Sequence, residues 1–256
     1  MSIKTEMSDA QLLLYNRQIM LPQIDIVGQQ KLLDASVAVL GAGGLGCPAL
    51  QYLVASGVGE IHLIDDDVIE LSNLQRQILF HSSDVGQKKV IVAKNSMALL
   101  NDQTEVMAYE ELPSEKKLRQ IFKKVDVVLD GTDNFASRYR HNKLCVETGT
   151  ALVAGAVIRF EGQVSCFINR YQDEPCYQCI YPDAIDENEN CTENGVLGSV
   201  AGTIGTIMAT EAIKIILNIG SPLESRLLLL DALQQEWRSL KVSQDENCLV
   251  CKKKRT

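Results

Sequence analysis

The sequence predicts an α/β fold: a Rossmann-like doubly wound sheet, parallel in its first half and continued by antiparallel strands. Short apolar strands alternate with helical patterns from residue 36 to 155, the order expected of a parallel sheet with helices on both faces. A glycine-rich turn, Gly41 to Gly46, joins the first of these strands to its helix. After residue 155 the pattern becomes a hairpin, a long helix and a further strand. One continuous sheet is the simplest arrangement.

The elements of the first half follow from local patterns. Ser8 begins a capping box with Gln11, ahead of a helical pattern that Pro22 ends. Apolar runs of strand length then alternate with patterns of helical period. We predict strands at 36–40, 60–65, 104–109 and 125–130, and helices at 46–56, 86–100, 114–123 and 135–148. Such a series favours parallel pairing with right-handed crossovers.

The second half has a different pattern. Residues 157–168 predict a hairpin that turns at positions 161–162. The acidic stretch 183–193 has almost no core-forming residues and is predicted to be mobile. A long buried helix should end near residue 220, with a strand at 227–231.

Length and composition predict a single domain, 1–256. The 46% of hydrophobic residues suffices for a packed core, and neither a repeat nor a linker interrupts the chain. We divide it into a helical segment (1–35), the alternating half (36–155), a second half (156–251) and a basic tail (252–256). The net charge of −8 makes nucleic acid an unexpected partner, and no apolar window is long enough for a membrane span.

Two Cys-x-x-Cys pairs, Cys176/Cys179 and Cys248/Cys251, have the spacing of zinc ligands. Four thiolates leave no open coordination position on zinc, so we predict a structural site. Eight cysteines without an N-terminal apolar signal indicate a reducing cytoplasm, where paired cysteines more often hold metal than form disulfides.

The other cysteines and the histidines have no metal-ligand spacing. We predict buried structural thiols inside helix or strand patterns at Cys47, Cys145 and Cys166. We assign no role to His62, His81 and His141. Cys191 remains as a candidate reactive thiol, because it precedes a helix whose dipole could lower its pKa.

The glycine turn has the form of a dinucleotide fingerprint. Gly41, Gly43 and Gly46 follow a strand and open a helix, so the backbone can approach phosphate. Asp65 ends the next strand, where a carboxylate can bind ribose hydroxyls. These residues alone would also suit a nicotinamide-dependent oxidoreductase, and that alternative stays open here.

Three further clusters favour a nucleoside triphosphate with metal. Asp65-Asp66-Asp67 is followed by the segment 72–77, whose arginine and amides suit phosphate and an adenine edge. Lys88 and Lys89 open a helix, where an ammonium group can reach phosphate. Asp133 follows the carboxyl end of a core strand with Arg138 beside it, and a carboxylate near phosphates commonly binds Mg²⁺.

Taken in order, the motifs resemble the small bacterial ThiF/MoeB/HesA branch of the ubiquitin-activating-enzyme superfamily. The similar stretches cover nearly the whole chain, from about residue 11 to 251. They are 15–19, the glycine turn, 71–77, 132–134, 160–163, 175–179 and the closing cysteine pair.

The resemblance implies a nucleotidyltransferase, in which ATP and Mg²⁺ adenylate the C-terminal glycine of a ubiquitin-like sulfur carrier ending in Gly-Gly. The activated carrier then forms a thiocarboxylate for molybdopterin or thiamine biosynthesis. In such a homodimer, 36–155 is the nucleotide-binding half and 156–251 the carrier-binding and zinc half. The chain shows no rhodanese extension after Cys251, so we expect a separate protein to donate sulfur.

The resemblance also implies roles for individual residues. Glycines 41, 43 and 44 would line the phosphates, and Asp65 would hold the ribose. The remaining expected nucleotide or phosphate contacts are Asp67, Ser72, Asn73, Arg76, Lys89 and Asn134, with Lys88 as the rival to Lys89. Asp133 would bind Mg²⁺, and Arg17 would act in the site of the opposite subunit. Cys191 would attack the acyl-adenylate or relay sulfur, or have no required role.

The resemblance leaves the carrier undetermined. The segment 158–163 favours the molybdopterin type and 235–240 the thiamine type, while a peptide-modifying relative is a third possibility. A non-catalytic zinc adaptor that binds ubiquitin-like folds is a further alternative, against which Arg76, Lys89 and Asp133 argue.

Overall fold

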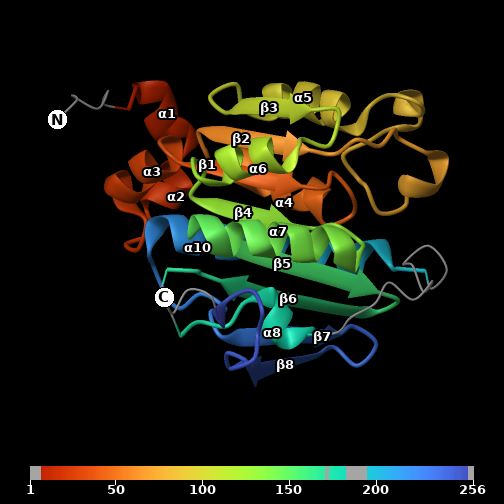
Figure 1. Ribbon diagram of the computed structural model, residues 1–256. Helices are drawn as coiled ribbons and strands as arrows, with labels where there is room; N and C mark the ends of the chain where they lie inside the picture. The colour runs from red at the N-terminus through yellow and green to blue at the C-terminus, as the bar shows by residue number, and fades with distance from the viewer. Residues whose placement is uncertain (1–6, 171–172, 183–194, 253–256) are drawn as a thin grey trace.

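A computed structural model describes residues 7–170, 173–182 and 195–252 of the chain. Its centre is one eight-stranded sheet with strand order β3-β2-β1-β4-β5-β6-β7-β8 (Figure 1). The strands are β1 (Ser36–Leu40), β2 (Glu60–Ile64), β3 (Glu105–Tyr109), β4 (Val127–Asp130), β5 (Ala151–Ile158), β6 (Glu161–Phe167), β7 (Arg226–Asp231) and β8 (Glu236–Lys241). The α-helices are α1 (Asp9–Leu14), α2 (Asn16–Ile19), α3 (Asp25–Leu33), α4 (Gly46–Ala55), α5 (Lys89–Leu100), α6 (Glu115–Phe122), α7 (Phe135–Thr148), α8 (Tyr177–Ile180) and α10 (Gly198–Leu217).

The sheet changes direction at β5, as the sequence predicts. The five strands from β3 to β5 pair in parallel, and β5, β6, β7 and β8 pair antiparallel. In the parallel part, Leu40 is level with Ile64 on one side and Asp130 on the other. The carboxyl ends of β1, β2 and β4 therefore lie at one edge of the sheet.

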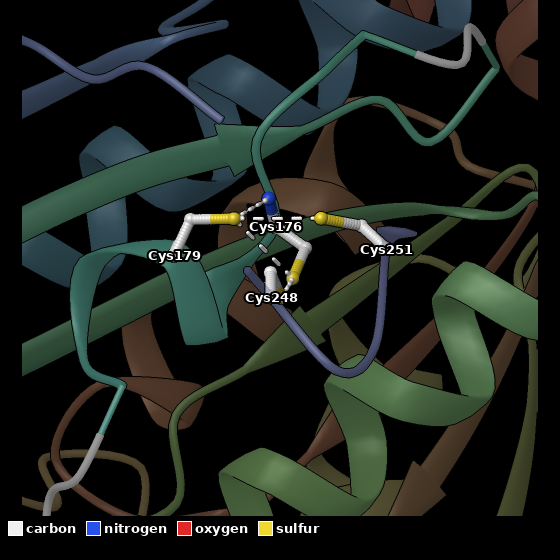
Figure 2. Close-up of side chains that lie close together, drawn as sticks. All are labelled: Cys176, Cys179, Cys248 and Cys251. Carbon is white, nitrogen blue, oxygen red and sulfur yellow. Dashed lines mark hydrogen bonds between the residues drawn. The ribbon is translucent and has the colours of Figure 1, made fainter. Parts of the chain in front are cut away.

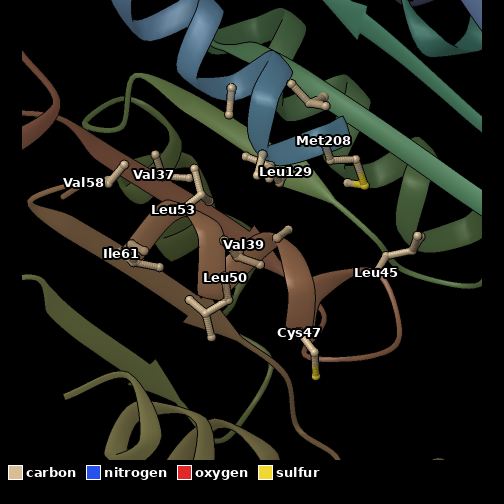
Figure 3. Close-up of a cluster of buried hydrophobic side chains, with 14 of the residues drawn as sticks. Val37, Val39, Leu45, Cys47, Leu50, Leu53, Val58, Ile61, Leu129 and Met208 are labelled. Atoms are coloured by element: carbon tan, nitrogen blue, oxygen red, sulfur yellow. The ribbon is translucent and has the colours of Figure 1, made fainter. Parts of the chain in front are cut away.

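Helices cover both faces of the sheet. On one face α3, α4, α5 and α10 pack over β1, β2 and the strands up to β7. Figure 3 shows part of this core, to which Val39 of β1, Leu53 of α4 and Met208 of α10 all contribute. On the other face α6, α7 and α8 cover a second core that includes Phe122 and Phe167. The parallel strands are apolar on both faces because both are covered.

The long helix α10 is a core helix. By length and composition it is apolar enough to cross a membrane, and 56% of its apolar window is buried. It packs against α3, α4, β5 and β6. Met208 fits against Gly155, and Ile204 fits against Gly162, where an added Cβ would lie within 2.6 Å of those side chains. These close contacts are the packing expected of a buried helix in a globular core.

The hairpin turn predicted at residues 161–162 is wrong by two positions. Glu161 and Gly162 already belong to β6, and the turn lies at Arg159-Phe160, where Arg159 has a φ of +53°. Gly162 is glycine because α10 approaches that strand, rather than because the chain reverses there.

The N-terminal helix also differs from its prediction. The capping box of Ser8 and Gln11 is confirmed. The helix then breaks at Tyr15, whose ring is buried against Gly57 and whose hydroxyl accepts a hydrogen bond from Asn101. A tertiary contact thus divides the predicted helix into α1 and α2.

Some helices and strands were not predicted, and two predictions lie outside the described residues. The helices α3 and α8 and the edge strand β8 have no counterpart in the predicted elements. The acidic stretch 183–193 and nearly all of the tail, 253–256, are outside the described residues.

Candidate active site

The site lies where the strand order reverses. The β1–α4 loop and the β4–α7 loop leave adjacent strands whose other neighbours lie on opposite sides, the position at which open α/β sheets bind ligands. Gly41 donates its N–H to Ile64, and Gly131 donates to Leu40, with N···O distances of 2.9 and 3.1 Å. The two loops therefore start from fixed points beside each other.

The glycine loop is shaped by close backbone approaches. Gly41 has a φ of +91°, and a Cβ on Gly46 would lie 1.8 Å from the Gly41 carbonyl oxygen. No other residue type fits these two positions without a change of backbone. Gly43 has open space, since its nearest neighbour is the Gln77 amide nitrogen at 3.9 Å. The loop can thus present backbone N–H groups at the start of α4 to an anion.

Asp65 anchors the glycine loop. Its carboxylate accepts hydrogen bonds from the N–H groups of Ala42, at 2.7 Å, and Asp67, at 2.9 Å. Burial raises the pKa of Asp65, and nearby Lys89 and the two N–H groups oppose that rise. The residue expected to hold ribose therefore also fixes the loop expected to hold phosphate.

The two candidate lysines lie in different surroundings. Lys89 is 5% exposed, and its ammonium group lies 2.7 Å from the Asp67 carboxylate at the glycine-loop side of the sheet. The Lys88 ammonium group bonds the Asp66 carbonyl at the exposed surface. The geometry favours Lys89 over its neighbour as the phosphate contact.

The segment 71–77 borders the same loop. Arg76 passes the glycine loop, its Cγ 3.3 Å from where a Cβ on Gly44 would lie, and donates to the Ser72 carbonyl. Asn73 is buried and accepts a hydrogen bond from the N–H of Glu70. Arg76 therefore brings positive charge to the loop, while the Asn73 carbonyl oxygen already serves the local turn.

Gln77 belongs to the same segment, whose amides were expected to suit phosphate or an adenine edge, but it was not among the individual site residues predicted. It is 3% exposed, and its side-chain carbonyl oxygen has no hydrogen-bond partner among the described residues. Its amide group faces Gly43. A buried amide with an unmatched atom beside the glycine loop is a further candidate nucleotide contact, and the sequence pattern marked its segment but not this residue.

Asp133 and Asn134 lie on the β4–α7 loop and have different surroundings. Asp133 is exposed, and its carboxylate receives a 3.4 Å contact from the Asn134 amide. Asn134 is the N-cap of α7, accepting from the N–H of Ser137 at 2.8 Å. Asp133 is thus available to a cation, whereas the Asn134 side chain already caps a helix.

Asp130 holds the loop that carries Asp133. It accepts hydrogen bonds from the N–H and hydroxyl of Thr132 and pairs with His141 at 2.9 Å. Burial opposes its charge, but His141, Arg138 and the Thr132 hydroxyl outweigh burial and hold the pKa of Asp130 at about 2. His141, to which the sequence assigned no role, is buried, with 7% of its surface exposed.

A cavity of about 450 Å³ opens beside Asp133. Its floor is the α7 and α8 face of β5 to β8, including Ala156, Gln163 and Leu229. Tyr177 and Arg138 line it as well. The cavity therefore reaches the β4–α7 loop of the switch point at Asp133.

The four predicted zinc ligands form one cluster. Their sulfur atoms point toward one another (Figure 2) and all lie within 4.8 Å. Three of the distances are 4.0 Å (Cys176–Cys179), 3.7 Å (Cys176–Cys248) and 3.4 Å (Cys179–Cys251). Zinc with about 2.3 Å bonds separates its sulfur ligands by about 3.8 Å. The cluster therefore fits a tetrahedral Zn²⁺ ion.

A model of the ThiF family matches residues 15–250. The chain belongs to the ThiF family. It is 42% identical over 242 residues to the sulfur carrier protein adenylyltransferase of Thermus thermophilus, covering 93% of this chain and 89% of that protein. It is 40% identical to two Escherichia coli proteins, the sulfur carrier protein ThiS adenylyltransferase and the molybdopterin-synthase adenylyltransferase. Those matches cover 96% of this chain and 97% and 98% of the relatives.

A solved structure agrees with this assignment. Escherichia coli MccB with ATP superposes with a TM-score of 0.76 at 25% identity, covering 88% of this chain and 69% of that chain. The family and the fold class predicted from the sequence are confirmed. The relatives named above are adenylyltransferases rather than nicotinamide-dependent oxidoreductases.

In this ThiF-family chain, Arg17 does not join the other candidates. It is exposed on α2, whose Gln18 donates to the carbonyl of Ser56 at the far end of α4. α4 starts at the glycine loop and runs for ten residues, about 15 Å. Figure 1 accordingly shows α1, α2 and α3 at the edge opposite the strand tips. Arg17 lies remote from its own subunit's site.

The remaining candidate, Cys191, lies outside the described residues. Cys47, Cys145 and Cys166 are fully buried, as predicted. Burial raises the pKa of Cys47 to about 12, so this thiol near the glycine loop stays protonated.

Proposed function

We propose that this chain adenylates the C-terminal glycine of a ubiquitin-like sulfur carrier, using ATP. The observation that carries the proposal is the position at the switch point of the glycine loop, two cationic side chains (Lys89 and Arg76) and Asp133, which also lines a cavity of about 450 Å³. The names of the relatives support the same reaction.

The chain's residues would work mainly by position and charge. N–H groups at the start of α4, together with Lys89 and Arg76, neutralise the triphosphate. The carrier carboxylate, held in the cavity, attacks the α-phosphorus; an oxygen–phosphorus bond forms, and the bond to the departing pyrophosphate breaks. No protein nucleophile is required, so Cys191 has no part in this step. Pre-positioning the two reactants supplies a large share of the rate.

Asp133 fits a Mg²⁺ ligand because its carboxylate is exposed at the tip of the loop and free of cationic partners among the described residues. Bound there, the metal would neutralise charge on the phosphates. Zinc, held by the four cysteines, would have no catalytic role, because its coordination is complete.

A homodimer would complete the site through Arg17. The helices α1 to α3 expose a run of large apolar side chains beside it. They are Leu13, Leu14, Met20, Leu21, Ile26 and Val27, each about half exposed or more. Because Arg17 lies remote from its own subunit's site, it could serve only a neighbour, as in a two-fold dimer.

A mixture of two inactive variants tests this arrangement. Arg17→Ala and Asp133→Asn subunits should together recover activity, in about a quarter of all sites if subunits exchange at random. A verified mixed dimer that stays inactive would rule out Arg17 acting in trans.

The direct test mixes the protein with ATP, Mg²⁺ and candidate carriers ending in Gly-Gly, of the ThiS and molybdopterin types. Mass spectrometry of the carrier should show the adenylate with one of them. A peptide is tested in the same way, as a third candidate substrate beside the two types of carrier. ATP·Mg²⁺ should raise the melting temperature, and NAD should not. Failure of every carrier to react with a protein that binds ATP would overturn the proposed substrate class.

The remaining parts of the proposal concern the cell. A reducing cytoplasm would keep the four cysteines available to zinc. A separate protein would supply sulfur to the activated carrier.

A further inference from the structure

One face of α7 carries three buried polar residues that the proposed chemistry does not use. Arg138, His141 and Asn142 are 8%, 7% and 0% exposed. Their spacing places them side by side on the helix. A buried polar group destabilises the fold unless it is hydrogen-bonded, so each of these three side chains needs a bonding partner in the protein. Those partners lie at two different places in the molecule.

The first place is the Asp133 loop. Arg138 donates from Nε to the Thr132 carbonyl at 2.9 Å and from Nη2 to the Gly155 carbonyl at 3.0 Å. Thr132 immediately precedes Asp133, and Gly155 lies in β5. The guanidinium group therefore clamps the Asp133 loop to a central strand.

The second place is the four-cysteine cluster. The Asn142 side chain accepts from the N–H of Tyr177 at 3.0 Å and donates to the Cys176 sulfur at 3.5 Å. Tyr177, which follows Cys176 directly, is 3% exposed. Its hydroxyl accepts from Arg138 at 3.4 Å, and the guanidinium carbon lies 6.0 Å from its ring centre. Tyr177 thus joins a cysteine ligand to the arginine that holds the Asp133 loop.

The position of Tyr177 depends on the cluster. α8 has four residues, too few to be stable without tertiary contacts. The sulfur contacts from Cys176 to Cys248 and from Cys179 to Cys251 bring the C-terminal end of the chain to this short helix. Holding the four sulfur atoms together therefore also holds the ring against which Arg138 packs.

We propose that the four-cysteine centre positions the Asp133 loop through Tyr177 and Arg138, so that metal occupancy and ATP·Mg²⁺ binding are coupled. The proposal rests on the role given to Asp133 above. Arg138, Tyr177 and Asn142 are positioning residues that act on the site through the Thr132 carbonyl. Because coupling between two binding sites is reciprocal, each ligand changes the affinity of the other by the same factor.

The test is a pair of affinities in three proteins: wild type, Tyr177→Phe and Tyr139→Phe. Tyr177→Phe keeps the ring and removes the hydroxyl that meets Arg138. Tyr139→Phe is the matched control, because that hydroxyl bonds the Tyr181 carbonyl at 2.6 Å in the same aromatic cluster. Calorimetry gives the Kd of ATP·Mg²⁺ with zinc loaded and zinc removed, and circular dichroism verifies that each sample is folded.

In wild type and Tyr139→Phe, zinc removal should weaken ATP·Mg²⁺ binding by about fivefold or more. Tyr177→Phe should bind ATP·Mg²⁺ more weakly when zinc is loaded and lose most of the zinc dependence. Equal ATP·Mg²⁺ affinity in the zinc-loaded and zinc-free wild type would overturn the proposal, as would an unchanged zinc dependence in Tyr177→Phe.

If the zinc-free protein does not fold, the coupling is tested in the other direction, by measuring the zinc affinity with and without ATP·Mg²⁺. A chromogenic chelator competes for zinc at equilibrium, with and without saturating ATP·Mg²⁺. ATP·Mg²⁺ should tighten zinc binding in wild type and Tyr139→Phe but not in Tyr177→Phe. A general stabilisation of the folded state would instead tighten it in all three. A wild type that fails to bind ATP at all contradicts the proposed function, whereas one that binds ATP without zinc dependence contradicts only the coupling.

Discussion

The two loops at the switch point are held in different ways. The glycine loop is shaped by its own backbone and tied to Asp65, the first residue after the neighbouring strand. The Asp133 loop is held by side chains: Asp130 at the end of β4 and Arg138 from α7, which in turn are bonded by His141 and Tyr177. The glycine loop thus depends mainly on close approaches of its own backbone, whereas the loop of the predicted metal ligand depends on bonds from the side chains of β4 and α7.

The largest expected effect is on the stability of the glycine loop. Gly46→Ala places a Cβ 1.8 Å from the Gly41 carbonyl oxygen, so the backbone must shift, at a cost of about 3 kcal/mol. Urea unfolding measures this loss. Gly43→Ala is the control, since nothing lies within 3.9 Å, and its stability should change by less than about 0.5 kcal/mol. Equal stability losses in the two variants would mean that the loop is not shaped by close approach.

The next effect is on rate, with stability unchanged. Asp133→Asn removes an exposed carboxylate, so the melting temperature should stay the same. Carrier-dependent exchange between pyrophosphate and ATP should fall by at least about 100-fold, because charge opposite the metal is lost in the transition state. Near-wild-type exchange by this variant would remove Asp133 from the mechanism.

The support of the second loop should depend on pH. Asp130 has a pKa of about 2 in the folded protein, below the value of about 3.9 expected when unfolded. The folded pKa is lowered, so its contribution of about 2 kcal/mol is present above pH 4 and is lost as pH falls from about 4 to 2. The free energies of unfolding of wild type and Asp130→Asn, measured against pH, should therefore converge over that interval. If the two curves instead stay parallel over this pH range, ionisation of Asp130 does not contribute to the stability of the folded protein.

The smallest effect separates capping from nucleotide binding at Asn134. Asn134→Ala removes the N-cap of α7 and should cost about 1 kcal/mol in stability. Asn134→Asp keeps a capping oxygen and should retain most of that stability. If Asn134 acts only as a cap, both variants bind ATP as wild type does. A tenfold weaker ATP affinity in folded Asn134→Ala protein would instead support the predicted nucleotide contact.

Most of the fold could be predicted because its signals are local. Strand and helix periods, the capping box at Ser8 and the glycine turn each depend on a few adjacent residues. The exposed edge strand β8 was missed because it lacks a buried face to create an alternating pattern. The hairpin turn was misplaced because Gly162 resembles a turn residue but serves packing against Ile204.

The candidate site also combines features that the sequence predicts with features that only folding creates. The sequence by itself determined the ThiF-type motifs, the cysteine pairs and the carboxylate after β4, since residue type and spacing specify them. Only the tertiary structure decided that Lys89 is buried beside Asp67, that Arg17 lies at the opposite edge of the sheet, and that Tyr177 meets Arg138. The physical reason is that burial, hydrogen bonding and distance across the sheet depend on elements brought together only by folding.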